Sequence, residues 1–211
     1  MAETARKAQL LAMIESPGTS PATDEAAARS RIERRLYESR TVLVFGEIDM
    51  PLAERVSAQL LALASENKRP IRVLINSPGG HVESGDTIYD ILRFIEPEVT
   101  ILGTGWVASA GALIFSAAPR ERRFSLPNTR FMLHQPSGGA GGPASDIEIE
   151  ALQILSVRTR LNRIFAEATG QSLEKIARDT DRNHWLSAAE AVAYGLVGRI
   201  IESESALRPN D

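Results

Sequence analysis

Residues 71–80 have the sequence IRVLINSPGG, and this stretch does most to decide the fold. A short continuous apolar run such as IRVLI predicts a strand that is buried in a sheet. The NSPGG that follows predicts a tight turn, because proline and glycine interrupt regular structure. A helical pattern comes next and ends at Pro97. Its apolar face consists of Ile88, Ile91, Leu92 and Ile95.

The same alternation of strand and helix continues on both sides of this stretch. Further strands are predicted at 41–46 (TVLVFG), 99–103 (VTILG), 122–125 and 130–133. Further helices are predicted at 52–66 and from the small residues at 108–112 to residue 118. Strands that alternate with helices favour a largely parallel sheet, so the predicted fold class is α/β. No internal repeat is visible.

A long helix is predicted after the glycine-rich segment 138–142 and extends to Gly170. Ser145 and Glu148 have the spacing of a capping box at its start. Its apolar stripe covers roughly six turns, which is more than a small domain needs to cover itself. We therefore interpret it as an oligomerisation element, with an ordinary core helix as the alternative.

The two ends of the chain have different compositions. Residues 1–31 are rich in Ala, Ser, Thr, Pro and charged residues, and we interpret them as a mobile arm. Near the other end, Ser187 and Glu190 form a second capping box, which predicts a last helix that Gly195 ends. Residues 202–211 are a predicted tail.

Length, charge and residue types exclude several classes of protein. The 211 residues suit one domain with a substantial core, and the net charge of -3 argues against a nucleic-acid partner. Without cysteine the chain has no disulfide, no thiol nucleophile and no thiolate zinc site, and its three histidines lack a metal-ligand spacing. No apolar run is long enough to cross a membrane, and no signal peptide is evident, so we expect a cytoplasmic protein without metal or cofactor.

Ser109 is the candidate nucleophile. It lies between the predicted strand at 99–103 and a helix, in the small-residue segment GTGWVASAGA at 103–112. A serine at such a junction is presented on a sharp turn, close to backbone N–H groups that can stabilise an oxyanion. The arrangement is similar to a nucleophile elbow, although G-x-S-x-G itself is not matched. A simple helix N-cap is the alternative.

His134 is the candidate general base. It ends the predicted strand RFMLH, and a proline and a glycine-rich loop follow it, which favours a position facing a surface cleft. A structural histidine is the alternative. In the turn Ser77-Pro78-Gly79-Gly80, glycine lets the backbone approach a ligand, and its N–H is a candidate for an oxyanion hole. A simple connection between strand and helix is the alternative there.

Together these segments resemble the proteolytic subunit of the Clp protease family. The matching stretches are INSPGG at 75–80, IYDILRFI at 88–95, GWVASAGALIFSAA at 105–118, RRFSLPNTRFMLHQP at 122–136, DIEIEA at 146–151 and TGQSLEKIARDTDRNHWLSAAEAVAYGLV at 169–197. The resemblance implies a peptidase domain at 32–201 with a crotonase-like fold of repeated ββα units. It also implies a protruding handle helix around 137–169.

The resemblance also implies an activity, partners and site residues. The chain would be a serine-type endopeptidase in two stacked heptameric rings, a tetradecamer, and would cleave unfolded polypeptides that a separate ATP-using unfoldase supplies. Ser109 matches the family's nucleophile and His134 its base, and Gly80 and Ala110 match the amides of the oxyanion hole. Asp181 and Arg182 match a pair at the contact between rings.

The third member of the triad departs from the family pattern. The resemblance places Asn183 where an aspartate is expected. An amide can accept the N–H of the histidine, but it carries no charge to stabilise an imidazolium, and the same exchange in a serine protease triad costs about 10⁴ in turnover. We therefore predict reduced activity, which Asn183→Asp should raise. Asp179 and Asp181 are candidate substitutes for the missing carboxylate.

A second departure concerns the ATPase partner. Arg72 and Leu74 stand on the strand before SPGG where family members often carry tyrosine for unfoldase docking, so the resemblance leaves this partner open. Two alternatives follow. One is a regulatory or weakly active subunit in a mixed complex with a second paralogue. The other is a crotonase-type acyl-CoA enzyme, which the pairing of Ser109 with His134 disfavours.

Overall fold

The structure is a computed structural model and describes residues 21–207. The chain divides into two compact units, Met1–Ser39 and Arg40–Asp211. The first contains helix α2 (Pro21–Glu38). Residues 21–31, which the sequence analysis placed in a mobile arm, are therefore helical, and residues 1–20 of that arm lie outside the described residues.

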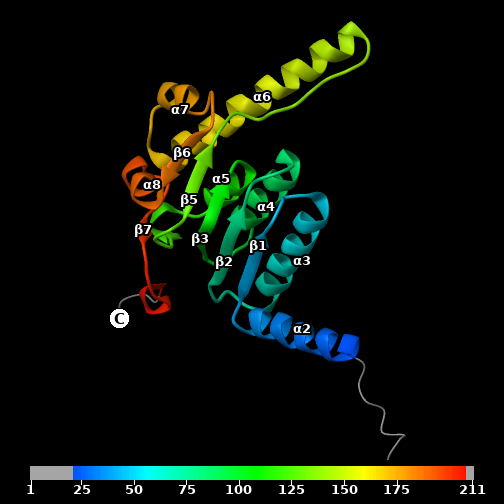
Figure 1. The fold of residues 1–211 in the computed structure, drawn as a ribbon, viewed down its shortest axis with the longest axis vertical. Helices are drawn as coiled ribbons and strands as arrows, with labels where there is room; N and C mark the ends of the chain where they lie inside the picture. The colour runs from blue at the N-terminus through cyan, green and yellow to red at the C-terminus, as the bar shows by residue number, and fades with distance from the viewer. Residues whose placement is uncertain (1–20, 208–211) are drawn as a thin grey trace, which may run out of the picture. The chain divides into compact units, whose positions relative to one another are not determined.

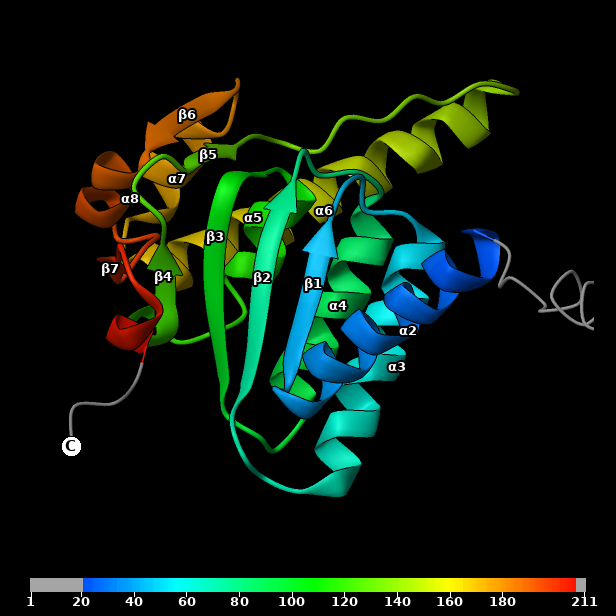
Figure 2. The same ribbon diagram turned by 60° about the horizontal axis from the view of Figure 1, so that its bottom comes forward.

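The second unit begins with the predicted alternation. Its elements are, in order, β1 (Thr41–Phe45), α3 (Met50–Glu66), β2 (Ile71–Ser77), α4 (Val82–Phe94), β3 (Val99–Ala108) and α5 (Ala110–Phe115). Strands β1, β2 and β3 pair in parallel, and helices α3, α4 and α5 pack on the same side of them (Figure 2). This confirms the α/β class and the largely parallel sheet.

The rest of the chain adds further strands to the sheet beyond β3. The remaining elements are η1 (Arg120–Arg122), β4 (Arg123–Ser125), β5 (Arg130–Leu133), α6 (Ala144–Thr169), α7 (Leu173–Asp179), β6 (His184–Ser187), α8 (Ala188–Tyr194), β7 (Arg199–Ile200) and η2 (Glu204–Leu207). The path of the sheet is β1-β2-β3-β4-β7, while β5 pairs with the later part of β3. Only the pairing of β5 with β6 is antiparallel among the described strands. β6 and β7 are not predicted by the sequence.

The core lies between the sheet and its helices. Alternate residues of β2 are buried because both of its neighbours in the sheet are strands and α3 to α5 cover one face. Val44, Ile75, Leu60 and Ile88 are fully buried there. Burial of such side chains contributes about 1.5–3 kcal/mol each, so this packing fixes the ends of β2 and β3 at which the chain turns.

Two predicted boundaries are wrong, each for a local reason. β3 continues to Ala108 instead of ending at residue 103, because its later part gains a second partner in β5. The capping box predicted for Ser145 with Glu148 does not form. Helix α6 begins at Ala144, so Ser145 is already inside the first turn, and Pro143 is the N-cap without a side-chain hydrogen bond.

Helix α6 extends well beyond the sheet, as the yellow-green helix of Figure 1 shows, and has 26 residues. Its outer part exposes a set of large apolar side chains: Ile147, Ile149, Leu152 and Leu155. The predicted protruding helix is therefore present, and only its last turns contribute to the core, through residues such as Leu161 and Phe165. Among residues 21–207, no helix is both long and apolar enough to span a membrane.

Candidate active site

Ser109 occupies a strained turn between β3 and α5. Its φ of 54° and ψ of -121° are unusual for a residue with a side chain. The Ser109 N–H donates to the carbonyl of Met132, which ties the turn to β5. The Ser109 side chain makes no capping bond to α5, so the structure does not favour the N-cap alternative. The conformation is that of a side chain presented at a sharp strand-to-helix turn, as in a nucleophile elbow.

His134 follows β5 and faces this turn. Its Nε2 lies 2.7 Å from Ser109 Oγ, and its Nδ1 lies 3.0 Å from Asn183 Oδ1. The contact with Asn183 follows from the sheet, because Leu133 pairs with His184 across the antiparallel β5–β6 ladder. Three residues that are far apart in the sequence are thus arranged as serine, histidine and amide in one line of hydrogen bonds.

The orientation of the Asn183 amide decides which tautomer of His134 is present. With Oδ1 towards the ring, Nδ1–H donates to Asn183 and Nε2 is free to accept the Ser109 hydroxyl proton. An amide can also turn its NH₂ towards Nδ1, which places the ring proton on Nε2 and prevents Nε2 from acting as a base. A carboxylate only accepts, so it would enforce the productive tautomer.

The backbone around Ser109 leaves two N–H groups available. Within the described residues, the amides of Gly80 and Ala110 make no recorded hydrogen bond. Gly80 is held by a bridge to Ile48, and a Cβ on Gly80 would lie 2.2 Å from the Ile48 carbonyl oxygen. A side chain is therefore excluded at this position, where the sequence analysis expected one of the oxyanion amides.

Gly79 is a residue whose importance the sequence analysis missed. A Cβ on Gly79 would lie 2.6 Å from the Cβ of Ser109 and 3.1 Å from its Oγ, and its φ is +98°. Only glycine fits both the space and the backbone conformation. The GG pair of SPGG thus serves two purposes, since Gly79 makes room for Ser109 while Gly80 packs on Ile48. The signal in the sequence was the doubled glycine itself.

A small apolar cavity adjoins Ser109 and His134. Its volume is about 20 Å³. The other lining residues are Val82, Ala110, Leu113, Pro136, Leu161 and Phe165. At this volume the cavity is too small for a substrate side chain, so it does not by itself indicate a cleavage preference.

The two aspartates considered as substitutes for a triad carboxylate are engaged elsewhere. Asp179 accepts hydrogen bonds from Lys175 Nζ at 2.5 Å and from the Tyr194 hydroxyl at 2.7 Å. Burial opposes its ionisation, but these two hydrogen bonds outweigh burial and lower the pKa of the Asp179 carboxyl. Asp181 contacts Arg158 at 3.3 Å and Gln135. Neither carboxylate has a recorded hydrogen bond to His134, whose recorded partners are Ser109 and Asn183.

Arg182, predicted together with Asp181 at a contact between rings, is exposed. Within the described part of the chain, no ion pair is recorded between Arg182 and Asp181. Asp181 pairs with Arg158 of α6 instead.

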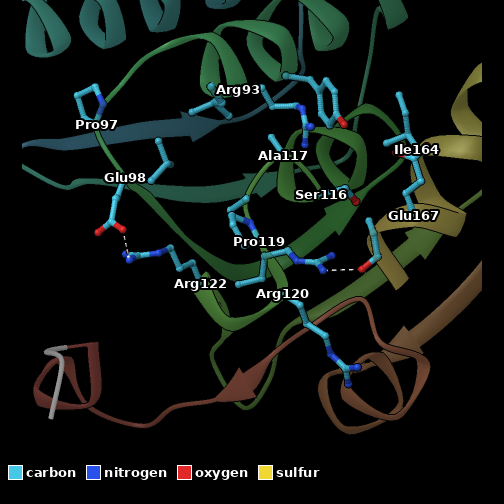
Figure 3. Close-up of a pocket in the computed structure, with 16 residues that line it drawn as sticks. Arg93, Pro97, Glu98, Ser116, Ala117, Pro119, Arg120, Arg122, Ile164 and Glu167 are labelled. Atoms are coloured by element: carbon cyan, nitrogen blue, oxygen red, sulfur yellow. Dashed lines mark hydrogen bonds and ion pairs between the residues drawn. The ribbon is translucent and has the colours of Figure 1, made fainter. Parts of the chain in front are cut away.

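A larger hollow of about 460 Å³ lies away from the triad (Figure 3). The C-terminal ends of α4, α5 and α6 line it, together with Arg93, Arg120, Arg122 and Arg123. Arg122 pairs with Glu98, and the buried Arg123 donates to the carbonyl of Ala168 at the end of α6. Burial and the nearby Arg120 lower the pKa of Arg123 to about 10. Helix C-termini carry partial negative charge, which offsets these cations, so we assign the cluster a structural role.

Comparisons with known proteins match this geometry to one family. The family model described as Clp protease matches residues 24–204. The chain belongs to the Clp protease family. It is 59% identical over 183 residues to "ATP-dependent Clp protease proteolytic subunit 3" of Rhizobium etli, covering 87% of this chain and 94% of that protein. It is also 59% identical over 181 residues to subunit 2 of Gluconobacter oxydans, covering 85% and 81%.

Solved structures agree with this assignment. ClpP1 from Listeria monocytogenes is 55% identical, with a TM-score of 0.76 over 84% of this chain and 99% of that one. An asparagine-to-aspartate mutant of the same protein has a TM-score of 0.79 at the same identity and coverage. The predicted family, the ClpP-type fold and the activity class of a serine endopeptidase in a Clp protease are therefore confirmed. The acyl-CoA alternative finds no support.

Proposed function

We propose that Ser109, His134 and Asn183 are the catalytic triad of this subunit and that the amides of Gly80 and Ala110 form its oxyanion hole. The observation that carries the proposal is the line of hydrogen bonds from Ser109 Oγ to His134 Nε2, at 2.7 Å, and from His134 Nδ1 to Asn183, at 3.0 Å. The amides of Gly80 and Ala110, which have no recorded hydrogen bond within the described residues, support the second part.

The reaction would proceed through an acyl-enzyme. His134 Nε2 takes the proton of Ser109 as Oγ attacks the scissile carbonyl carbon, whose oxygen becomes the oxyanion. The imidazolium then gives this proton to the leaving amine, and the C–N bond breaks. In the second half, His134 takes a proton from water as the water oxygen attacks the acyl carbon of the ester. The bond between that carbon and Ser109 Oγ then breaks, and Oγ receives the proton from His134.

We further propose that the subunit works in stacked rings and has reduced intrinsic activity. The exposed apolar residues of α6, from Ile147 to Leu155, support self-association through this helix. Asn183 supports the reduced activity, because its amide does not neutralise the imidazolium and does not enforce the tautomer. The proposed partners are other ClpP-type subunits, including a second paralogue in mixed rings, an ATP-using Clp unfoldase and unfolded polypeptide substrates.

Strand β2 is the surface on which the family's unfoldase docks, and in this chain it is contacted by the C-terminal segment. Arg72, on this strand, pairs with Glu204 of η2 at 2.9 Å, so the C-terminal segment contacts β2 where the family's tyrosine is often found. A regulatory role in a mixed complex is the second candidate function, which the neutral Asn183 favours.

One experiment separates the two candidates. The purified full chain is treated with a serine-directed fluorophosphonate probe and assayed with a short fluorogenic peptide. Labelling of Ser109, and loss of both labelling and turnover in Ser109→Ala by a factor of at least ~10³, are expected for a peptidase. A chain that stays unlabelled and inactive both alone and when assembled with a second paralogue would be regulatory. Ser65→Ala, on the exposed end of α3, is the matched control.

A further inference from the structure

The loop that carries Asn183 joins α7 to β6. Within the described residues, the Asn183 side chain has one recorded hydrogen bond, to His134. Nothing else recorded holds this amide in place, so its position follows from the backbone of the loop. The position of Asn183 therefore depends on the β5–β6 pairing on its C-terminal side and on the anchors of residues 180–182 on its N-terminal side.

The first anchor of the loop is buried. The Thr180 hydroxyl is 3.0 Å from Asn162 Oδ1 of α6 and also donates to the carbonyl of Ile176. Thr180 and Asn162 are both almost fully buried. This contact fixes the start of the loop on the inner part of α6.

The second anchor consists of hydrogen bonds made near the surface by Gln135, the residue that follows His134. The Gln135 N–H donates to the carbonyl of Thr180 at 2.6 Å, and Gln135 Nε2 donates to the carbonyl of Asp181 at 2.7 Å. Arg158 of α6 contacts the Asp181 carboxylate at 3.3 Å. Gln135 and Arg158 therefore hold Asp181 from two sides, two residues before Asn183.

From this arrangement, and resting on the proposed triad, we infer that Gln135 and Arg158 are positioning residues that act on the reaction through Asp181 and Asn183. The reason lies in the amide. A carboxylate stabilises an imidazolium by charge, which weakens only slowly with distance. An amide does so by a directional hydrogen bond, which weakens steeply when its angle is poor. A site with Asn183 is thus more sensitive to the placement of the loop than a site with an aspartate.

The exposed ion pair has little value for stability. The Arg158 and Asp181 side chains are 31% and 57% exposed, and such pairs typically contribute at most about 1 kcal/mol. We therefore expect Arg158→Gln to leave the melting temperature of the chain unchanged. We expect it to lower kcat by about 3- to 10-fold with KM unchanged, because small misplacements of catalytic groups are costly.

A double-mutant series tests this inference on the full chain. Arg158→Gln and Gln135→Ala are each made with Asn183, with Asn183→Asp and with Asn183→Ala, and peptide turnover and size are measured for all. The kcat loss should be largest with Asn183, smaller with Asn183→Asp and absent with Asn183→Ala, since residues that act as a unit are not additive. Arg158→Lys should restore part of the rate. Arg163→Gln, an exposed arginine of α6 without a recorded partner in the described residues, is the control.

Three results would overturn the inference. The first is the same fold-loss in all three backgrounds, which would mean that the two residues act independently of Asn183. The second is no loss in any background, and the third is a loss that follows dissociation of the assembly. Failure of the proposed triad is a separate outcome, because it would appear as turnover that survives Ser109→Ala.

Discussion

The two sides of His134 are built in different ways. On the nucleophile side, Ser109 sits against Gly79 and is followed by α5, all of whose residues are buried. On the other side, Asn183 is exposed and depends on a loop whose anchors include the half-buried Gln135 and the exposed Asp181. Close packing tolerates little change, whereas exposed hydrogen bonds are individually weak. The nucleophile is therefore fixed by the fold, while the partner of the base is held by contacts that are easily altered.

The largest expected effect is on the packed side. Gly79→Ala would place a Cβ 2.6 Å from the Cβ of Ser109, at a φ that disfavours side chains, so Ser109 must move. We expect kcat for a short peptide to fall by about 100-fold, as displacements near 1 Å can cause. Gly139→Ala, where no atom lies within 4 Å of the added Cβ, is the control. Equal activity of the two variants would show that Ser109 is less constrained than its packing indicates.

The next effect is on the exposed side and has the opposite sign. Asn183→Asp would supply a charge that stabilises the imidazolium and an acceptor that fixes the tautomer of His134. We expect peptide turnover and the rate of fluorophosphonate labelling to rise by about 10-fold or more. Turnover that stays the same or falls would mean that the loop does not present a carboxylate to Nδ1, and the proposed role of Asn183 would be wrong.

A smaller effect concerns the helix that precedes the Asn183 loop. Asp179, at the end of α7, has a lowered pKa in the folded chain, so its contacts stabilise the fold above the unfolded pKa of about 3.9 and lose this effect as the pH falls through the folded pKa. Asp179→Asn should reduce the free energy of unfolding by about 1–3 kcal/mol at pH 7. The difference should shrink below about pH 4. Urea midpoints at both pH values measure it, with the exposed Asp90→Asn as control.

The smallest expected effect is on the free energy of unfolding, and it distinguishes the two predicted capping boxes. Ser187 accepts from the Glu190 N–H, while Glu190 accepts from the Ser187 N–H, so this box holds α8 directly behind the strand that follows Asn183. Ser187→Ala should cost about 1 kcal/mol in the free energy of unfolding. Ser145→Ala should change it by less than about 0.5 kcal/mol, because Ser145 caps nothing. Thermal unfolding of both variants decides the point, and equal losses would contradict the assignment of the caps.

The sequence by itself determined the alternating elements and the identity of the reactive residues. Apolar runs at β1 and β2, and the turn chemistry of SPGG, predict βα units because these preferences are local. The small residues around Ser109 and the strand end at His134 indicate a nucleophile and a base for the same reason. The overall match to the Clp protease family added Asn183 and Ala110 as candidates, and it chose Gly80 between the two glycines of the SPGG turn.

Only the tertiary structure decided how these residues meet. The contact of Asn183 with His134 depends on the β5–β6 pairing, and β6, with four residues, is too short to be predicted from its sequence. The closeness of Gly79 to Ser109, and the anchoring of Asp181 by Gln135 and Arg158, join residues separated by at least 23 positions. Such contacts follow from the packing of whole elements, so no local pattern in the chain specifies them.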